Sequence, residues 1–271
     1  MSEYDIMSDL LMEKDFGMAL GTLEMSESGI RDYLEYPQFS ALELPLDLFL
    51  QDGLDFFAGI PGDKYHILHC CNMMDRDLSG KICFLDQKLQ KDFIRKAEGI
   101  LDKIHSRNCS TLTFSCDMEQ ILADPEAEKN LLNLLHRLAP LLFQYRMTLL
   151  LPFRIPACSA ERITQMTRFL RNSMMANVKL QLEIYPYDSD IMDPSAMSCS
   201  SLFYETKSLI FFYDADCGNR ITKNIVRTWV MALDRYGFSG PFLLAPYSQR
   251  HRMVFPEAES FAKIISDLRN E

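Results

Sequence analysis

Long apolar segments are absent from this 271-residue chain. Its apolar runs fall well short of the roughly 18 residues that a membrane-spanning helix needs. The first five residues, Met1 to Asp5, also lack the basic and apolar regions of a signal peptide. The sequence therefore predicts a cytoplasmic protein that does not bind a membrane.

Basic residues are scarce as well. The chain has 28 Lys and Arg residues against 38 Asp and Glu residues, which gives a net charge of −10. Binding to nucleic acid without sequence preference requires clustered Lys and Arg side chains that displace counterions from the phosphates. We therefore expect no nucleic-acid partner.

Several motifs that bind metals, redox partners or nucleotides are missing too. The eight cysteines form no C-x-x-C pair, which argues against a zinc knuckle or a redox dithiol. The adjacent Cys70 and Cys71 have no evident base nearby in the sequence, so reduced, inert thiols are expected there. The G-x-G-x-x-G, G-x-x-x-x-G-K-[ST] and H-E-x-x-H motifs are absent. The sequence therefore predicts no cofactor.

What the chain does contain is a helix–strand unit that occurs twice in succession. Amphipathic helical patterns over residues 88–105 and 124–145 lead into apolar runs at 110–116 and 147–153. Short apolar strands between such helices indicate parallel strands that are buried on both faces. Pro140 lies inside the second helical pattern, where we expect a kink or a break.

The same pattern extends along nearly the whole chain. Apolar runs that predict strands, each followed by a helical segment, lie at residues 18–23, 40–44, 65–71, 110–116, 147–153, 178–184, 207–213 and 242–245. About 250 residues is typical of an eightfold α/β barrel. The predicted fold is therefore α/β, a single-domain (β/α)8 TIM barrel over residues 1–271, with residues 1–16 as a short N-terminal extension.

This order of segments resembles the xylose-isomerase-like TIM barrel superfamily. The resemblance covers roughly Met18 to Leu268 and rests on architecture and segment order. The superfamily includes sugar-phosphate isomerases and epimerases, together with apurinic-site nucleases of the endonuclease-four type. The resemblance implies a pocket at the carboxyl ends of the strands. In the catalytic members, carboxylates and histidines on strands five to eight bind a divalent metal there.

Strands five and eight of this chain depart from the family pattern. The family places a metal-binding glutamate on each. Here strand five ends in Pro152 and Phe153 instead, and strand eight ends in Ala245, Pro246 and Tyr247. A hard cation needs oxygen ligands that converge from several strands. We therefore expect a metal site that is altered or lost, and predict no metal ligands.

Strands six and seven keep only part of that pattern. The family has an Asp-x-x-His sequence after strand six. This chain offers Glu183, but Pro186 stands where the histidine is expected. Strand seven ends in Asp214 and Asp216, which retain acidic groups without the usual histidine.

Candidate site residues are the polar residues that end or interrupt the predicted strands, because barrel chemistry takes place at the carboxyl ends of the strands. Acidic and guanidinium groups together would suit a small polar ligand such as a sugar or sugar phosphate. A charge at a loop end is also often only solvated. The ligand-binding candidates are His69, Asp117, Arg154, Tyr185, Asp214, Asp216, Tyr247 and Arg250.

Glu43 and Glu183 are the catalytic candidates. Each lies within an apolar strand, where an unpaired carboxylate is costly unless it meets a cation, a hydrogen-bond donor or water. Two such groups could move the proton beside a carbonyl during isomerisation or epimerisation. The alternative is a structural salt bridge inside the barrel, for example with Arg154.

His69 and Arg154 also carry two interpretations each. His66 and His69 are separated by an odd number of residues, so only one of them faces the barrel interior, and His69 lies nearer the strand end. His69 is either a ligand-binding or a structural histidine. Arg154 is suited to bind a carboxylate or phosphate through two hydrogen bonds, or else to pair with Asp117 or Glu183.

The leading functional prediction is a sugar or sugar-phosphate isomerase/epimerase-like protein with an altered or lost metal site. The alternative is a non-catalytic carbohydrate-binding or regulatory barrel that has kept the pocket without the chemistry. An apurinic-site nuclease ranks third, because it needs a cluster of metal ligands and a basic DNA-binding face. The sequence makes no prediction of the oligomeric state.

Overall fold

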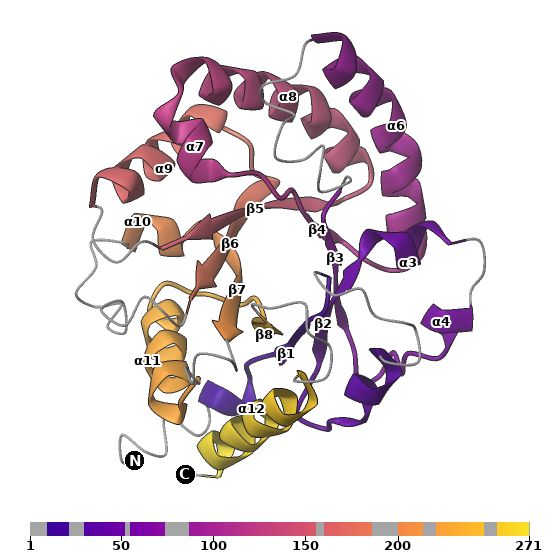
Figure 1. The fold of residues 1–271 in the computed structure, drawn as a ribbon, viewed down its shortest axis with the longest axis vertical. Helices are drawn as coiled ribbons and strands as arrows, with labels where there is room; N and C mark the ends of the chain where they lie inside the picture. The colour runs from indigo at the N-terminus through magenta and orange to yellow at the C-terminus, as the bar shows by residue number, and fades with distance from the viewer. Residues whose placement is uncertain are drawn as a thin grey trace.

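Eight parallel strands form a closed ring at the centre of the molecule, and helices surround it (Figure 1). The computed structural model describes residues 10–21, 30–51, 55–73, 87–155, 160–185, 200–213, 221–246 and 254–270. The strands follow one another around the ring in chain order, and the last pairs with the first. The (β/α)8 TIM barrel predicted from the sequence is confirmed.

The strands are β1 (Phe16–Ala19), β2 (Ala41–Pro45), β3 (Ile67–Cys71), β4 (Thr111–Thr113), β5 (Thr148–Arg154), β6 (Val178–Ile184), β7 (Thr206–Tyr213) and β8 (Phe242–Pro246). The two strands of the helix–strand pair that first indicated the fold, β4 and β5, are parallel neighbours, as predicted.

The surrounding helices are the 3-10 helix η1 (Asp32–Glu35) and α3 (Leu46–Leu50), α4 (Asp55–Ala58), α6 (Gln87–Ser106), α7 (Met118–Ala123), α8 (Pro125–Gln144), α9 (Ala160–Ser173), α10 (Ser200–Phe203), α11 (Lys223–Asp234) and α12 (Val254–Arg269). No helix in the described ranges is long and apolar enough to cross a membrane.

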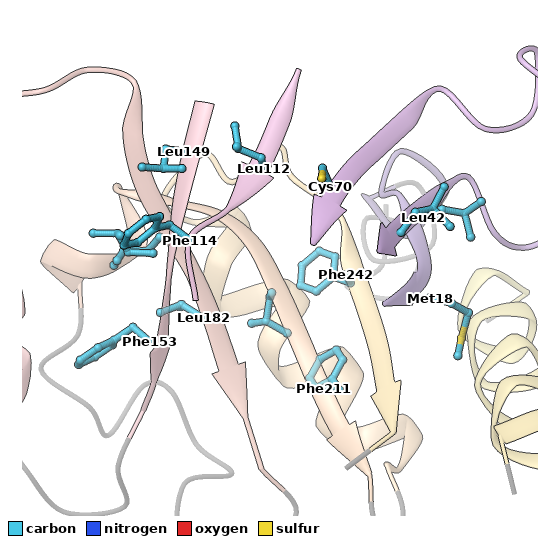
Figure 2. Close-up of a cluster of buried hydrophobic side chains, with 14 of the residues drawn as sticks. Met18, Leu42, Cys70, Leu112, Phe114, Leu149, Phe153, Leu182, Phe211 and Phe242 are labelled. Carbon is cyan, nitrogen blue, oxygen red and sulfur yellow. The ribbon is translucent and has the colours of Figure 1, made fainter. Parts of the chain in front are cut away.

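The apolar core has two layers because successive side chains of a strand point to opposite faces. The larger layer fills the space between the outer faces of the strands and the helices; Figure 2 shows members of it from every strand of the barrel. The smaller cluster fills the barrel interior, and its side chains come from β1, β2, β7 and β8: Ala19, Ala41, Ile210, Phe212, Leu243 and Ala245. Polar side chains supply most of the remaining interior positions.

The first strand begins earlier than predicted. It includes Phe16, which pairs with Phe242 of β8 and stacks on its ring at a centroid distance of 5.6 Å. Gly17 weakens the strand signal in the sequence, yet the structure requires a glycine there, since a Cβ atom would lie 1.8 Å from the Ala41 carbonyl oxygen. Phe16, the last residue of the predicted N-terminal extension, is therefore part of the barrel.

Two helical predictions need correction. The single helix predicted over residues 47–57 is two short helices, because Gln51 is extended (φ −62°, ψ 137°) and ends α3. The chain also forms α7, which was not predicted because a six-residue helix is too short to show a clear period. Asp124 caps α8 as predicted, and that helix continues through Pro140.

Four turns that lead from a helix into a strand contain a residue with positive φ. These are Asn108 (58°), Arg146 (53°), Met174 (52°) and Gly237 (70°). Helices commonly end on a left-handed residue, where glycine is favoured. Arg146 and Met174 therefore occupy positions that are strained for residues with a side chain.

Replacing Met174 by Gly should raise the free energy of unfolding by about 0.5–1 kcal/mol. The change relieves the left-handed strain and costs only the extra backbone entropy of glycine. It loses little packing, because Met174 is 89% exposed. Urea unfolding of the two proteins measures the difference. Glycine at the exposed, helical Glu98 is the control and should destabilise; equal effects at both sites would contradict the explanation.

Candidate functional site

An open cavity of about 460 Å³ lies at the carboxyl ends of β4, β5 and β6. Active sites of α/β barrels occupy this end of the strands. One wall comes from the segment that joins β4 to α7 and the first residues of α7, and the other comes from the ends of β5 and β6. The lining residues are Ser115, Cys116, Asp117, Met118, Glu119, Pro152, Phe153, Arg154, Glu183 and Tyr185.

Glu183 is the carboxyl group of the β5–β6 wall. It is partly buried, and it accepts a 2.9 Å hydrogen bond from the hydroxyl of Tyr185. Burial raises the pKa of Glu183 to about 7, and the nearby carboxyl of Glu43 adds to the rise, while Tyr185 and Arg154 oppose it. Glu183 is therefore able both to accept and to donate a proton near neutral pH.

Three side chains form a stack beside this carboxyl group. The guanidinium carbon of Arg154 lies 4.5 Å from the centre of the Tyr185 ring. On β7, the ring of Phe212 lies against Tyr185 with a centroid distance of 4.4 Å and an interplanar angle of 7°. The stack fixes the direction of the Tyr185 hydroxyl towards Glu183.

The carboxylates of the opposite wall are engaged in other bonds. Asp117 caps α7 by accepting a 3.0 Å hydrogen bond from the backbone N–H of Gln120. Glu119 forms an ion pair with Arg162 of α9. These bonds fix this wall of the cavity.

Glu43 lies deeper in the barrel interior and is not part of the cavity lining. It is 2% exposed and accepts a 2.7 Å hydrogen bond from the side-chain amide of Gln181. The thiol of Cys71 also hydrogen-bonds to it. Burial raises the pKa of Glu43, and these two hydrogen bonds only partly offset that rise. Its partner is thus an amide, and the salt bridge with Arg154 considered from the sequence is replaced by this neutral contact.

His69 faces the same interior region from β3. It is 3% exposed, and burial lowers its pKa to about 4, so the ring is neutral at physiological pH. Within the described ranges its Nδ1 atom has no hydrogen-bond partner, and the same is true of the Ser208 hydroxyl on β7. Buried polar atoms of this kind are commonly satisfied by ordered water.

Replacing Glu43 by Gln should flatten the pH dependence of stability. The folded state holds the Glu43 proton more tightly than the unfolded state does, so the stability from that proton is fully present below the unfolded pKa of about 4.3. It is lost by up to about 1.4 kcal/mol per pH unit as the pH rises towards the folded pKa. Urea unfolding between pH 5 and pH 8 measures the slope in each protein.

His69 and every other titrating group are common to both proteins, so the difference between the two slopes isolates Glu43. Glutamine at the exposed Glu98 of α6 is the matched control and should leave the slope unchanged. Parallel slopes for wild type and the Glu43→Gln variant would show that Glu43 is not protonated preferentially in the folded state.

The structure groups the sequence candidates into two sets. Asp117, Arg154, Glu183 and Tyr185 line one cavity, whereas Glu43 and His69 lie beneath it in the barrel interior. The other four candidates lie outside the described residues: Asp214, Asp216, Tyr247 and Arg250.

Two residues of this region were missed by the sequence analysis. Gln181 bonds to Glu43, and Phe212 completes the stack on Tyr185. Gln181 precedes Glu183 by two residues in one strand, so strand alternation alone puts both on the same face. Strand alternation could therefore have identified Gln181 from the sequence. No sequence pattern identifies Phe212, because it lies within a continuous apolar run.

The described residues do not fit the divalent metal that the family resemblance implies. Within the described ranges, no group of three or more His, Cys, Asp or Glu side chains lies close enough together to hold a metal ion. The positions expected to carry glutamates on β5 and β8 hold Pro152 and Ala245, whose side chains have no donor atom.

No protein-family model matches the sequence, and no curated protein matches it. Solved structures do resemble it. D-psicose 3-epimerase from Clostridium cellulolyticum H10, with D-tagatose, is 12% identical with a TM-score of 0.63, over 94% of this chain and 95% of that one. D-allulose 3-epimerase from a Methylomonas species is 14% identical with a TM-score of 0.64, over 94% and 96%.

A third similar structure is a xylose isomerase-like TIM barrel protein from Mycobacterium smegmatis in complex with magnesium. It is 10% identical with a TM-score of 0.57, over 96% of this chain and 99% of that chain. These alignments cover nearly all of both chains, at identities that establish the fold alone. The chain therefore has the fold of the xylose-isomerase-like TIM barrels and of the sugar epimerases built on it.

Proposed function

We propose that the protein is a sugar isomerase/epimerase-like enzyme whose proton-transferring group is Glu183. The observation that supports this role is the placement of a carboxyl group with a pKa of about 7 in an open cavity at the carboxyl end of the barrel. The similar structures include enzymes that are named for acting on psicose and allulose. The proposed ligand is a small sugar.

The proposed step begins with Glu183 ionised. Its carboxylate takes the proton from the carbon beside the sugar carbonyl, and the electron pair of the broken C–H bond forms the C=C bond of an enediol while the carbonyl oxygen gains the negative charge. The protonated Glu183 then returns the proton to the former carbonyl carbon, while the proton of the neighbouring hydroxyl group passes to the charged oxygen and the oxygen of that hydroxyl group becomes the new carbonyl. Arg154, beside Glu183, lowers the energy of the negatively charged oxygen.

A single carboxyl group fits isomerisation better than epimerisation. Isomerisation moves one proton between neighbouring carbons on the same face of the enediol, so one group suffices. Epimerisation delivers the proton to the opposite face and so requires a second acid. Among the described residues, the other carboxyl groups of the cavity are Asp117 and Glu119, and both are engaged in bonds of their own.

Deuterium exchange tests the proposal directly. The purified protein is incubated in D2O with a panel of neutral and phosphorylated aldoses and ketoses, and proton NMR follows exchange at the carbon beside the carbonyl. Exchange that continues in EDTA supports the proposal, because the described residues do not fit a metal. An enzyme that exchanges only with an added divalent metal would contradict it.

The second candidate function is a non-catalytic carbohydrate-binding barrel. Pro152 and Ala245 favour it, because they occupy positions where the family resemblance places catalytic glutamates. In the same experiment, a sugar that binds in calorimetry without any exchange would support this function and reject the enzyme. The predicted cytoplasmic location stays a prediction in either case.

Replacing Tyr185 by Phe should shift the acidic limb of the pH–rate profile to higher pH. The Tyr185 hydroxyl donates to Glu183 and stabilises its charged form, so its loss raises the pKa of Glu183 above about 7. The rate at high pH should change little. Phenylalanine at the exposed Tyr204 is the control. A limb that stays in place, or moves to lower pH, would show that another group sets the profile.

A further inference from the structure

The charges of this acidic chain are distributed very unevenly. From Asn130 to Leu182 there is one acidic residue, Glu161, although the whole chain has a net charge of −10. The same segment contains seven basic residues: Arg137, Arg146, Arg154, Arg162, Arg168, Arg171 and Lys179. It spans most of α8, all of β5 and α9, and most of β6.

Three of these arginines are exposed and have no partner among the residues that the structure describes. Arg162, Arg168 and Lys179 form ion pairs with glutamates. In contrast, the guanidinium groups of Arg137, Arg146 and Arg171 are exposed and have no ion pair or hydrogen bond in the described part of the chain. Unpaired arginines are available to bind carboxylates through two hydrogen bonds.

Two large apolar side chains lie in the same part of the molecule. Phe143, in the last turn of α8, is 82% exposed, and Met174, directly after α9, is 89% exposed. Arg146 and Met174 also hold left-handed backbone conformations that a glycine would adopt with less strain. The chain therefore keeps the side chains of Arg146 and Met174 at a cost in stability.

Phe143, Arg146, Arg171 and Met174 share one end of the barrel, and Arg137 lies about two turns earlier on α8. Helices α8 and α9 lead into the neighbouring strands β5 and β6, so both helices end at the amino ends of the strands, opposite the cavity. The side-chain amide of Asn177, in the turn after α9, donates a 3.4 Å hydrogen bond to the Ala139 carbonyl of α8. We call the region formed by Arg137, Phe143, Arg146, Arg171 and Met174 the basal surface.

We propose that the basal surface docks an acidic segment of a partner protein that also carries apolar side chains. The arginines match carboxylates of the segment, and Phe143 and Met174 supply apolar contact area. Aromatic residues, Met and Arg are enriched in protein interfaces. This interaction is separate from the cavity, which lies at the other end of the strands.

The charge distribution favours such a partner over other occupants. Two copies related by a twofold axis would bring the same arginines together, and like charges would repel. An anionic membrane would repel the rest of the chain, whose negative charge exceeds the positive charge of this segment. A short acidic segment contacts only the basal surface, so the negative charge of the rest of the chain does not oppose its binding as it would oppose binding to a membrane.

A random-peptide phage library panned against the full chain provides the test. The selected peptides are synthesised and titrated by fluorescence anisotropy at low and high NaCl. Two variants remove the features of the basal surface: the triple charge reversal R137E/R146E/R171E and the double change F143S/M174S. The matched control reverses three exposed lysines elsewhere, K91E/K96E/K263E. Near-UV circular dichroism confirms that each variant is folded.

We expect peptides enriched in Asp and Glu together with aromatic or aliphatic residues. The triple reversal should weaken their binding about 100-fold and the double change about tenfold, while the control binds as the wild type does. Peptides without acidic enrichment, or peptides that bind both variants as well as wild type, would overturn the proposal. So would self-association, or binding to phosphatidylserine vesicles, that the triple reversal abolishes.

Discussion

Replacing Glu183 by Gln should lower the rate of deuterium exchange by about 10²–10⁴-fold and leave sugar binding largely intact. Glutamine keeps the size of the side chain and still accepts a hydrogen bond from Tyr185, but it cannot take up a proton. The loss should therefore appear in kcat and not in the dissociation constant measured by calorimetry.

The Glu205→Gln variant is the control for this experiment. Glu205 pairs with Lys179 at 2.5 Å, so it is a carboxylate that contacts the same strand as Glu183 but at the opposite end of the barrel. It should exchange at the wild-type rate. A Glu183→Gln variant that retains exchange would remove Glu183 from the mechanism. If the wild type binds sugar without exchange, as the non-catalytic alternative predicts, the Glu183→Gln variant should show weaker sugar binding.

The Gly17→Ala variant should lose about 3 kcal/mol of unfolding free energy or fail to fold. The added Cβ would lie 1.8 Å from the carbonyl oxygen of Ala41, which is a main-chain atom of the neighbouring strand. Relief would require β1 to move away from β2, and closely packed interiors resist such shifts. Since β1 also pairs with β8, the movement would disturb the closure of the ring.

The chain provides an internal control for the glycine argument. A Cβ added to Gly99 on α6 meets nothing within 4 Å. Alanine there should raise the unfolding free energy by about 0.8–1 kcal/mol, the difference in helix propensity. Urea unfolding compares the two variants. A small change in unfolding free energy for both variants would contradict the prediction, because it would show that β1 and β2 separate easily.

Most of the barrel follows from the sequence because its strands are buried on both faces. The run from Val178 to Ile184 was predicted with the bounds that the structure shows, since apolar residues alternate with polar ones along its seven positions. Phe16 was missed because the close approach of Gly17 to Ala41 depends on a residue far along the chain. Local patterns do not contain that contact.

The site was harder to predict, for a related reason. The sequence identifies Glu43 and Glu183 equally, as carboxyl groups within apolar strands. The structure separates them, because depth in the barrel depends on how the strands are staggered. Glu43 lies beneath the cavity beside Gln181, and Glu183 lines it beside Tyr185. The alternation of side chains along a strand predicts the face to which each side chain points. It does not predict how far that side chain lies from the carboxyl end of the barrel.

The stack of Arg154, Tyr185 and Phe212 gives the cavity an optical signal of its own. A tyrosine held rigidly between a guanidinium group and a phenyl ring has an asymmetric environment and contributes to near-UV circular dichroism. A sugar that draws Arg154 away from the ring changes that signal. The single tryptophan, Trp229, is buried in α11 and contacts Phe203, so its fluorescence reports on the packing of the helices. Occupancy of the cavity and integrity of the fold are thus observable separately in the unmodified protein.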